Sequence, residues 1–291
     1  MAEAVIAVTG AGGGIGGRVA RRLADAGATT RLVSRRPEAL PDLAGATAVR
    51  GTDYTDAAGV GAAVAGAGVL FLVSARESAN RVREHATAID AAIEAGVGRI
   101  VYLSFLGAAA DCTFTFGRDH WHTEQYLRAT GVPFVALRDS TYASGLPAMT
   151  GTDGVLRGPA GDGRVSAVTP DDIAAVATAV LLDPSHDGQV LDVTGPEAIT
   201  LAEAAATLTE FTGRPVTYHA ETETEAYESR SVYGAPDHEV AGWVTSYLAI
   251  ATGELSVVAD TVPRLTGHPA QSFPDFLRAN PDSYAHLLPG A

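Results

Sequence analysis

The stretch that decides the fold reads Val8-Thr9-Gly10-Ala11-Gly12-Gly13-Gly14-Ile15-Gly16. Residues 4–8 are apolar and typical of a buried parallel strand, and residues 15–26 carry apolar side chains at helical spacing. A glycine-rich turn between a strand and a helix lets phosphate groups approach backbone N–H groups at the positive end of the helix dipole. The stretch therefore predicts a seat for a dinucleotide pyrophosphate, and a merely flexible turn is the alternative.

Three glycines of this turn have separate roles in such a seat. Gly10 permits the tight turn, Gly13 lets the backbone approach the phosphates, and Gly16 allows the helix to pack closely on the strand. We expect the phosphates to be held by Gly10, Gly13, Gly14, Ile15 and Gly16.

Length and composition fit one large α/β domain or one domain with a smaller appendage. The chain has 291 residues, of which 46% are hydrophobic. Its longest apolar stretch, residues 60–73, is interrupted by glycines, so we expect no membrane span and no membrane partner. The start of the chain shows no export signal, and the single cysteine, Cys112, fits a reducing compartment, so we expect a cytoplasmic protein.

The formal net charge of −14 argues against a nucleic-acid partner, because binding a phosphate backbone needs a basic face. Acidic residues are frequent in the C-terminal third, for example Glu221, Glu223, Glu225 and Glu228, and a solvated helix face explains them. The chain contains no lysine, so arginine must meet an anionic cofactor.

Strand-like and helix-like segments alternate over the first half of the chain and predict a doubly wound parallel sheet of the Rossmann type. The expected strands are residues 4–8, 30–33, 47–49, 69–73, 99–103 and 134–137, and the expected helices are residues 15–26, 37–43, 57–65, 80–95 and 118–130. We expect residues 1–138 to form the NADP-binding core. Residues 139–291 are expected to form a smaller substrate-side lobe that is packed on the core and interleaved with it.

In that lobe, residues 145–163 resemble a loop. The segment Thr169-Pro170-Asp171-Asp172 predicts a helix start, with threonine as the cap and proline at the first helical position. A strand near residues 189–193 and helices near residues 201–212, 237–252 and 271–279 are expected to complete the lobe.

The end of the second expected strand favours NADPH over NADH. In dinucleotide folds an acidic residue there holds the ribose 2′-hydroxyl of NAD, whereas this chain has Ser34-Arg35-Arg36. Guanidinium groups bind a 2′-phosphate by charge-assisted hydrogen bonds, although two arginines also suit a solvated helix start. Asp53-Tyr54 follows the third strand, where the carboxylate either accepts from the adenine amino group or caps the next helix. We also place Val73 and Ser74 in the cofactor site.

Several motifs together resemble the atypical short-chain dehydrogenase/reductase group. They are the G-x-x-G-x-x-G spacing, Asp53-Tyr54, His120-Trp121-His122-Thr123-Glu124, the run of residues 131–138 and Gly158-Pro159-Ala160-Gly161-Asp162-Gly163. Within that group the chain is similar to NmrA-like proteins, and especially to type 2 NADPH:quinone oxidoreductases and triphenylmethane-dye reductases. The resemblance covers the chain to about residue 215 and implies a Rossmann fold that binds NADP(H).

The resemblance also implies a departure from the usual active site of the larger superfamily. Typical members use a serine at the end of the fifth strand and a Tyr-x-x-x-Lys pair on the next helix. Ser104 occupies the serine position, but the helix carries Phe116 and His120, and the chain has no lysine. The quinone-reductase subgroup likewise has a histidine at the position of His120.

The candidate catalytic residues are His120, Tyr142 and Ser104. His120 can donate a proton or a hydrogen bond, and Glu124, four residues further along the helix, can orient it or raise its pKa; the alternative is a simple surface pair. Tyr142 lies in the loop after the sixth expected strand, where ligands of open α/β sheets bind, although it equally suits packing. We expect no metal, because Asp119, His120 and His122 do not form a metal-site pattern on one helix.

These features predict an NADPH-dependent oxidoreductase that transfers hydride to a quinone-like or conjugated acceptor, such as an enone, a dye or a polycyclic aromatic. Such an acceptor spreads or neutralises the incoming charge and therefore needs no tyrosine-lysine dyad. The alternatives are a non-catalytic NmrA-like redox sensor and a tailoring reductase or isomerase of a polycyclic natural product. The expected partner is a small molecule, and a homodimer is left open.

Overall fold

The computed structural model describes residues 4–290, which divide into two compact units that each draw on several parts of the chain. The first unit comprises the residues up to Phe105, Asp119–Arg138 and Ile173–Leu191, and the second comprises Leu106–Arg118, Asp139–Asp172 and the residues from Asp192 onward.

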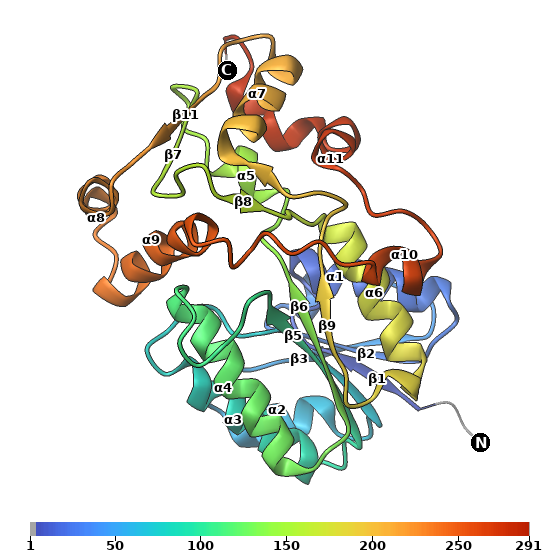
Figure 1. Ribbon diagram of the computed structural model, residues 1–291. Coiled ribbons are helices and arrows are strands. Elements are labelled where there is room, and N and C mark those ends of the chain that lie inside the picture. Colours follow the sequence, from blue (N-terminus) through green and yellow to red (C-terminus); the bar gives the residue numbers. More distant parts are fainter. Residues whose placement is uncertain (1–3, 291) are drawn as a thin grey trace. The chain divides into compact units, whose positions relative to one another are not determined.

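A seven-stranded sheet with the order β3-β2-β1-β4-β5-β6-β9 forms the first unit's centre (Figure 1). The pairings β2–β3, β1–β2, β1–β4 and β4–β5 are parallel. All six expected strands are present, with the bounds β1 Ile6–Val8, β2 Thr30–Ser34, β3 Ala46–Arg50, β4 Val69–Leu72, β5 Arg99–Phe105 and β6 Phe134–Asp139. The Rossmann-type α/β fold is thereby confirmed.

The seventh strand corrects one expectation. β9 (Val190–Val193) adds to this sheet beside β6, whereas the sequence had placed a strand near residues 189–193 in the C-terminal lobe. Its place follows from long-range hydrogen bonds such as that from Ala136 N to the carbonyl of Gln189, 3.1 Å. Local sequence does not encode such pairings.

The helices that connect the strands start and end close to the expected residues. They are α1 Gly14–Asp25, α2 Ala57–Val64, α3 Arg81–Glu94, α4 Thr115–Thr130 and α6 Pro170–Leu182. Thr169 caps α6 as expected, since its Oγ1 accepts from the Asp172 backbone N–H at 3.1 Å. The expected helix over residues 37–43 is only a 3₁₀ turn, η1 Pro37–Ala39, because Pro41 disfavours helical geometry at the residue before it.

The second unit contains more regular structure than the sequence predicted. The expected helices are α7 Leu201–Thr212, α9 Asp237–Ala251 and α11 Phe273–Ala279. Residues 145–163 are not all loop: they include α5 (Gly145–Ala148) and β7 (Val155–Gly158). β7 pairs in parallel with β11 (Thr217–Ala220), a long-range pairing. Further elements are β8 Arg164–Val165, η2 Pro184–His186, β10 Ile199–Thr200, α8 Glu223–Arg230, η3 Ser231–Tyr233, α10 Thr261–Thr266 and η4 Pro281–Leu287, of which η2 belongs to the first unit.

The acidic segment near residue 221 is only partly a solvated face. Glu223, Glu225 and Glu228 are exposed on α8, but Glu221 is buried and accepts a 2.7 Å hydrogen bond from Arg230 Nη1. The interpretation of Glu221 as a solvated residue was wrong, because its cation partner lies nine residues away and allows the carboxylate to be buried.

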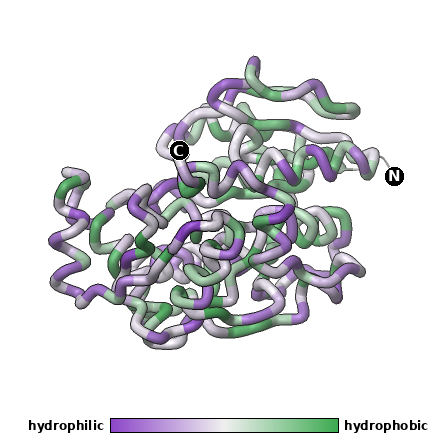
Figure 2. The backbone as a smooth tube through the Cα atoms, turned by 90° about the horizontal axis from the view of Figure 1, so that it is seen from above, coloured by the Kyte–Doolittle hydropathy of each residue, from purple (hydrophilic) through white to green (hydrophobic). Residues whose placement is uncertain are grey.

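Polar and apolar residues are interspersed along the backbone, as Figure 2 shows. Among residues 4–290, no helix combines the length and the apolar composition that crossing a bilayer requires.

Candidate active site

The turn between β1 and α1 has the geometry of a phosphate seat. Gly10 adopts a left-handed φ of +60°, and Gly13 N–H donates to the Gly10 carbonyl at 2.8 Å. Gly13 is the N-cap of α1, without a capping side chain, and the first turn of α1 contains no acidic residue. The first N–H groups of α1 have no partner within the helix, so they are oriented to meet an anion.

The space around these glycines fits a bound dinucleotide. A Cβ at Gly16 would lie 2.3 Å from the Gly10 carbonyl oxygen, so only glycine permits this close approach of helix and turn. A Cβ at Gly14 would meet nothing nearer than Arg18 Nη1 at 4.0 Å, which leaves the helix start open. Ile15 is buried and anchors the helix start in the core. The roles of these residues in holding phosphate stay predictions.

The ends of β2 and β3 bring together the residues expected at the adenosine end of the cofactor. Arg35 Nη1 lies 3.7 Å from Asp53 Oδ1, with both side chains about three-quarters exposed. Ser34 Oγ accepts from the Arg36 N–H at 3.1 Å. The parallel register pairs Ser34 with Arg50, whose Nη1 donates to the Arg35 carbonyl at 2.9 Å.

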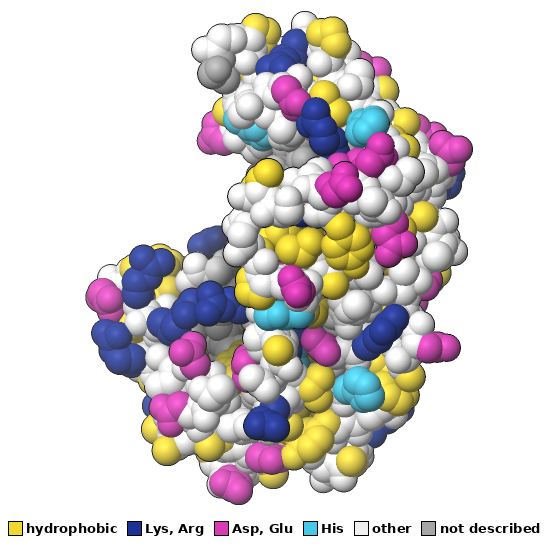
Figure 3. All heavy atoms as spheres, turned by 90° about the vertical axis from the view of Figure 1, so that its left-hand side faces the viewer, with side chains coloured by type: hydrophobic (Ala, Val, Ile, Leu, Met, Phe, Trp, Pro, Cys, Tyr) yellow, Lys and Arg dark blue, Asp and Glu magenta, His cyan; other side chains and the backbone are white. Residues whose placement is uncertain are grey.

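Arg50 is therefore a further basic residue at the adenosine end, and it was not predicted from the sequence. The register of β3 on β2, which pairs Arg50 with Ser34, places it there. Every basic side chain drawn dark blue in Figure 3 is an arginine, and several of them gather on one part of the face shown. The capping role considered for Asp53 falls to Asp56, which accepts from Gly59 N–H at 2.9 Å.

Tyr54 and Val73 hold the ends of the strands beside the glycine turn. The Tyr54 hydroxyl lies 2.8 Å from Thr9 Oγ1 and 2.7 Å from the Val73 carbonyl oxygen. A Cβ added to Gly10 would lie 3.3 Å from Val73, so Val73 supports the turn directly. Ser74 is half-buried and follows β4 at the same edge of the sheet. This geometry gives Tyr54 a structural part in shaping the seat.

His120 belongs to a buried network that has no ion pair, which we call the neutral network and define as His85, Tyr102, His120 and Thr123. The Tyr102 hydroxyl lies 2.9 Å from His120 Nδ1 and 3.4 Å from His85 Nδ1. His85 Nδ1 lies 2.8 Å from Thr123 Oγ1, and His85 Nε2 accepts from the Ala75 N–H at 2.8 Å. The Phe105 ring lies 6.2 Å from the His120 ring, between centroids.

Both imidazoles of this network resist protonation. Burial, with a further contribution from Arg81, lowers the pKa of His85 to about 3. Burial also holds the pKa of His120 well below its usual range, and Arg81, His85 and Arg138 lower it further. The expectation that Glu124 raises the pKa of His120 was wrong, because burial and the nearby cations lower this pKa and the Glu124 carboxylate bonds Arg138 and Ser104 instead.

Glu124 belongs to a second group, the charged cluster, which we define as Ser104, Glu124 and Arg138. Arg138 donates from Nε and Nη2 to the two Glu124 carboxylate oxygens at 2.9 and 2.7 Å, and Ser104 Oγ donates to Glu124 Oε1 at 2.6 Å. The Ser104 hydroxyl proton is thus engaged by Glu124. This geometry favours a positioning role for Ser104 over the catalytic role expected from its place in the sequence.

The candidate Tyr142 and the residue at the usual tyrosine position, Phe116, belong to the second unit. The Tyr142 hydroxyl donates to Asp139 Oδ2 at 3.0 Å, and the half-buried side chain stays a candidate for contact with an acceptor. Phe116, at the position where the larger superfamily has its tyrosine, is buried: a Cβ on Gly242 would lie 2.0 Å from its ring, so Gly242 makes room for the phenyl group.

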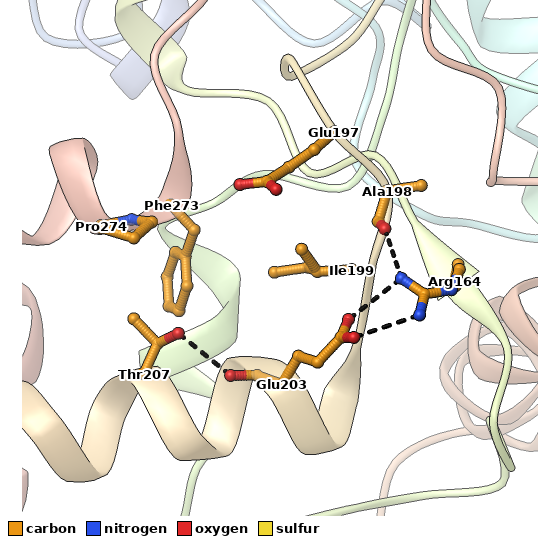
Figure 4. A pocket seen from close by; sticks show the side chains of 8 residues that line it. All are labelled: Arg164, Glu197, Ala198, Ile199, Glu203, Thr207, Phe273 and Pro274. Carbon is orange, nitrogen blue, oxygen red and sulfur yellow. Dashed lines mark hydrogen bonds and ion pairs between the residues drawn. The ribbon is translucent and has the colours of Figure 1, made fainter.

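The second unit also has a cavity of about 280 Å³, whose lining Figure 4 shows. Arg164 donates to both Glu203 carboxylate oxygens at 3.1 Å and to the Ala198 carbonyl at 2.8 Å. The same glutamate completes the capping box of α7 with Thr200. Arg164 and Glu203 thus satisfy each other and the start of α7, which gives these two residues of the lining a structural role.

The sequence alone did not predict that His85 and Tyr102 lie beside His120. His85 lies within an expected helix and Tyr102 within an expected strand, and neither was singled out as a site residue. Tyr102 and Ser104 share one face of β5, because alternate residues of a strand point the same way. The two-residue spacing of Tyr102 and Ser104, together with the four-residue spacing of His120 and Glu124 on α4, is the sequence pattern that could have predicted these contacts.

Comparison with known proteins agrees with this geometry. Residues 10–184 match the NAD(P)H-binding family model. The chain is 35% identical, over 97% of its length and 99% of the relative's, to the (4-alkanoyl-5-oxo-2,5-dihydrofuran-3-yl)methyl phosphate reductase of Streptomyces griseus. The crystal structure of the NADPH-dependent quinone oxidoreductase of Escherichia coli complexed with NADPH is similar, with a TM-score of 0.85, 31% identity, and coverage of 94% of this chain and 99% of that chain.

A third similar protein is the triphenylmethane reductase of Citrobacter sp. complexed with NADP(H), with a TM-score of 0.79, 27% identity and coverage of 94% and 99% of the two chains. The similarity to these reductases was expected from the motifs, and it extends well past residue 215, where the expected resemblance ended. The glycine turn, the sheet order and the family match agree, and the chain belongs to the NAD(P)H-binding family.

Proposed function

We propose that this protein is an oxidoreductase that uses NADPH to reduce a quinone-like or otherwise conjugated small molecule. The observation that carries the proposal is the open start of α1, where backbone N–H groups can meet an anion. In addition, the chain is similar over 94% of its length to a quinone oxidoreductase crystallised with NADPH. The Streptomyces griseus relative and the Citrobacter sp. structure are also named as reductases, of a phosphate ester and of triphenylmethane dyes respectively.

The residues present fit the cofactor. The N–H groups of Gly14, Ile15 and Gly16 would hold the pyrophosphate, and Gly10 and Gly13 shape the turn that brings them there. Arg35 and Arg36 would hold a 2′-phosphate, supported by Arg50, whereas an acidic residue in their place would repel it.

When bound, NADPH supplies the hydride, and the protein supplies binding, alignment and exclusion of water. His120 is the proposed hydrogen-bond donor to the acceptor, Tyr142 is the second candidate, and Ser104 positions Glu124 and, through it, α4. A conjugated acceptor delocalises the incoming charge, so its final protonation can use solvent.

Turnover tests the proposal directly. Purified protein should oxidise NADPH with at least one member of a panel containing a benzoquinone, a naphthoquinone, an enone and a cationic triphenylmethane dye. The combined variant His120→Ala and Tyr142→Phe should lose most of its turnover with the quinones and the enone. A complete lack of NADPH oxidation across the panel, or undiminished turnover of these carbonyl acceptors in the combined variant, would contradict it.

Cofactor preference has its own test. Arg36→Ala should raise the Kd for NADPH about tenfold, equivalent to about 1.4 kcal/mol, and leave the Kd for NADH unchanged, as measured by fluorescence titration. Arg83→Ala is the matched control, because Arg83 is an exposed arginine on a different helix, α3. Equal losses for both cofactors would contradict a 2′-phosphate contact.

We also propose that the protein acts in the cytoplasm and forms a homodimer. The single cysteine, Cys112, suits a reducing compartment. Val232 and Tyr233 on η3 are 79% and 72% exposed, which is unusual for large apolar side chains. Light scattering coupled to size-exclusion chromatography decides the oligomeric state, and a monomeric mass at micromolar concentration would refute the dimer.

A further inference from the structure

The hydrogen bonds of His85 fix which of its ring nitrogens carries the proton. His85 Nε2 lies 2.8 Å from the backbone nitrogen of Ala75, and a backbone N–H can only donate. Nε2 therefore carries no proton, and the neutral ring has its proton on Nδ1. That proton is donated to Thr123 Oγ1 at 2.8 Å, and the Thr123 hydroxyl in turn donates to the Asp119 carbonyl at 2.8 Å.

This assignment determines the direction of the next hydrogen bond. The Tyr102 hydroxyl cannot donate to His85 Nδ1, because that nitrogen already carries a proton. Its single proton therefore goes to His120 Nδ1, 2.9 Å away. Tyr102 is fully buried, and Thr123 Oγ1, the other oxygen near its hydroxyl, already accepts from His85 and donates to the Asp119 carbonyl, so His120 Nδ1 is the unprotonated acceptor at hydrogen-bond distance.

His120 consequently carries its own proton on Nε2. The side chain is 5% exposed, and Nε2 has no hydrogen-bond partner among residues 4–290. His120 Nε2 is not one of the fully enclosed side-chain atoms that lack a hydrogen-bond partner, so this nitrogen is not completely enclosed. The network thus orients one unused N–H donor at the surface of the first unit's core.

We propose that His85, Thr123 and Tyr102 are positioning residues that hold His120 as the neutral Nε2–H tautomer, and that this N–H recognises the carbonyl oxygen of the acceptor. The proposal rests on the proposed function. In the reduction, a C–H bond of the reduced nicotinamide breaks, its electron pair forms a new bond to the acceptor, and an electron pair of the acceptor moves onto the carbonyl oxygen. His120 donates a hydrogen bond to that oxygen and keeps its proton, and a solvent proton completes the reduced product.

The charged groups around His120 support a neutral donor. Arg81 and His85 on α3 and Arg138 on β6 all lower its pKa in addition to burial, and Tyr102 on β5 is held protonated by its own burial. Glu124, on the same helix as His120, directs its carboxylate to Arg138 and Ser104. No carboxylate hydrogen-bonds to His120 among the described residues, so the ring lacks the partner that would favour its cationic form.

A neutral N–H donor discriminates between classes of acceptor. A quinone or enone develops negative charge on oxygen, where one oriented donor contributes about 100-fold or more to the rate. A cationic triphenylmethane dye accepts hydride at carbon and becomes neutral, so it gains little from the donor. The proposal therefore makes His120 a determinant of specificity for carbonyl acceptors.

The first arm of the test is ¹⁵N NMR of the histidine rings in the protein without cofactor. The expected spectrum shows protonated Nε2 and unprotonated Nδ1 for His120 and the opposite for His85, without titration of either ring between pH 6 and 8. Tyr102→Phe should mix the tautomers of His120. Tyr126→Phe is the control, since Tyr126 lies on α4, the helix of His120, but its hydroxyl donates to Asp90 and not to His120.

The second arm compares two acceptors. Tyr102→Phe should lower kcat about tenfold with a naphthoquinone and His120→Phe about 100-fold, and each variant should lower kcat for the cationic dye by a much smaller factor. The Kd for NADPH of Tyr102→Phe should stay within about twofold of the wild-type value. If Tyr102→Phe fails to fold, the tautomers of His85 and His120 in the wild-type spectrum and the comparison of the two acceptors with His120→Phe still test the proposal.

An Nδ1–H tautomer of His120, its titration near neutral pH, or equal losses with quinone and dye would overturn the proposal. If the wild-type protein reduced neither acceptor, the proposed function and the recognition role would both fail. The NMR result would then still decide separately whether the network fixes the tautomer.

Discussion

Two neighbouring groups join β5 to α4 in different ways. The neutral network links Tyr102 to His120, and the charged cluster links Ser104 to Glu124 and Arg138. The β5 residues are two apart and the α4 residues four apart, so the two groups are adjacent on the same faces. Both histidine and glutamate are ionisable and almost fully buried, yet only the glutamate has a partner of opposite charge.

The difference shows that burial alone does not set the charge of a side chain. Glu124 receives three hydrogen bonds, two of them from a guanidinium group, and these compensate the loss of water. His120 has cations and a phenol as neighbours, which makes its protonated form unfavourable. The charged cluster is therefore suited to fixing α4 in place, and the neutral network to presenting a donor.

The largest expected effect comes from breaking the charged cluster. Glu124→Ala should lower the free energy of unfolding by roughly 4 kcal/mol, because it leaves Arg138 without its carboxylate partner. Urea denaturation measures this, with Glu38→Ala as the control, since the Arg50–Glu38 pair is about two-thirds exposed and worth no more than about 1 kcal/mol. A similar small loss for both variants would contradict the importance of the buried pair.

The neutral network should produce a pH dependence of stability. The pKa of His85 is about 3 in the folded protein and near 6.5 when unfolded, so between these values the unfolded chain binds more protons and stability falls as pH falls. From about pH 7.5 to about pH 4.5 this removes about 2.7 kcal/mol, and His120 acts in the same direction.

Urea denaturation at both pH values checks the pH prediction. His85→Gln should show a smaller difference between the two, because it removes one of the two titrating groups. An unchanged difference in that variant would show that other groups cause the acid sensitivity.

The smallest expected effect comes from Ser104. Ser104→Ala removes one hydrogen bond to a carboxylate that keeps its two bonds from Arg138, so it should cost about 1.5 kcal/mol in stability. The kcat for quinone should fall less than threefold, because the hydroxyl positions Glu124. A 100-fold loss of kcat with unchanged stability would instead give Ser104 the catalytic role expected from the sequence.

Much of the fold was predictable from local patterns. Six strands of the main sheet follow from apolar runs, and α1, α2, α3, α4 and α6 follow from helical spacing and caps such as Thr169. The failures are elements whose existence depends on distant partners. β9 joins β6 across about 50 residues of sequence, and β7 exists because β11 pairs with it.

The candidate site was predictable to a lesser degree. His120 was named as a candidate from the sequence and stays one, but its expected partner Glu124 bonds Ser104 and Arg138. Residues four apart on a helix can meet, yet their side chains also face the strand beneath, where stronger partners were available. Nothing local to Tyr102 or His85 marks them as more than core residues.

The sequence by itself determined the glycine turn that we expect to seat the cofactor, because the glycines of residues 10–16 act through their own backbone and the turn is complete within one strand and one helix. The tertiary structure decided the protonation of His120, since that depends on Tyr102, on His85 and on the Ala75 amide, each from a separate segment. Backbone geometry is a local property of the chain, whereas a pKa and a tautomer belong to the three-dimensional surroundings of a group.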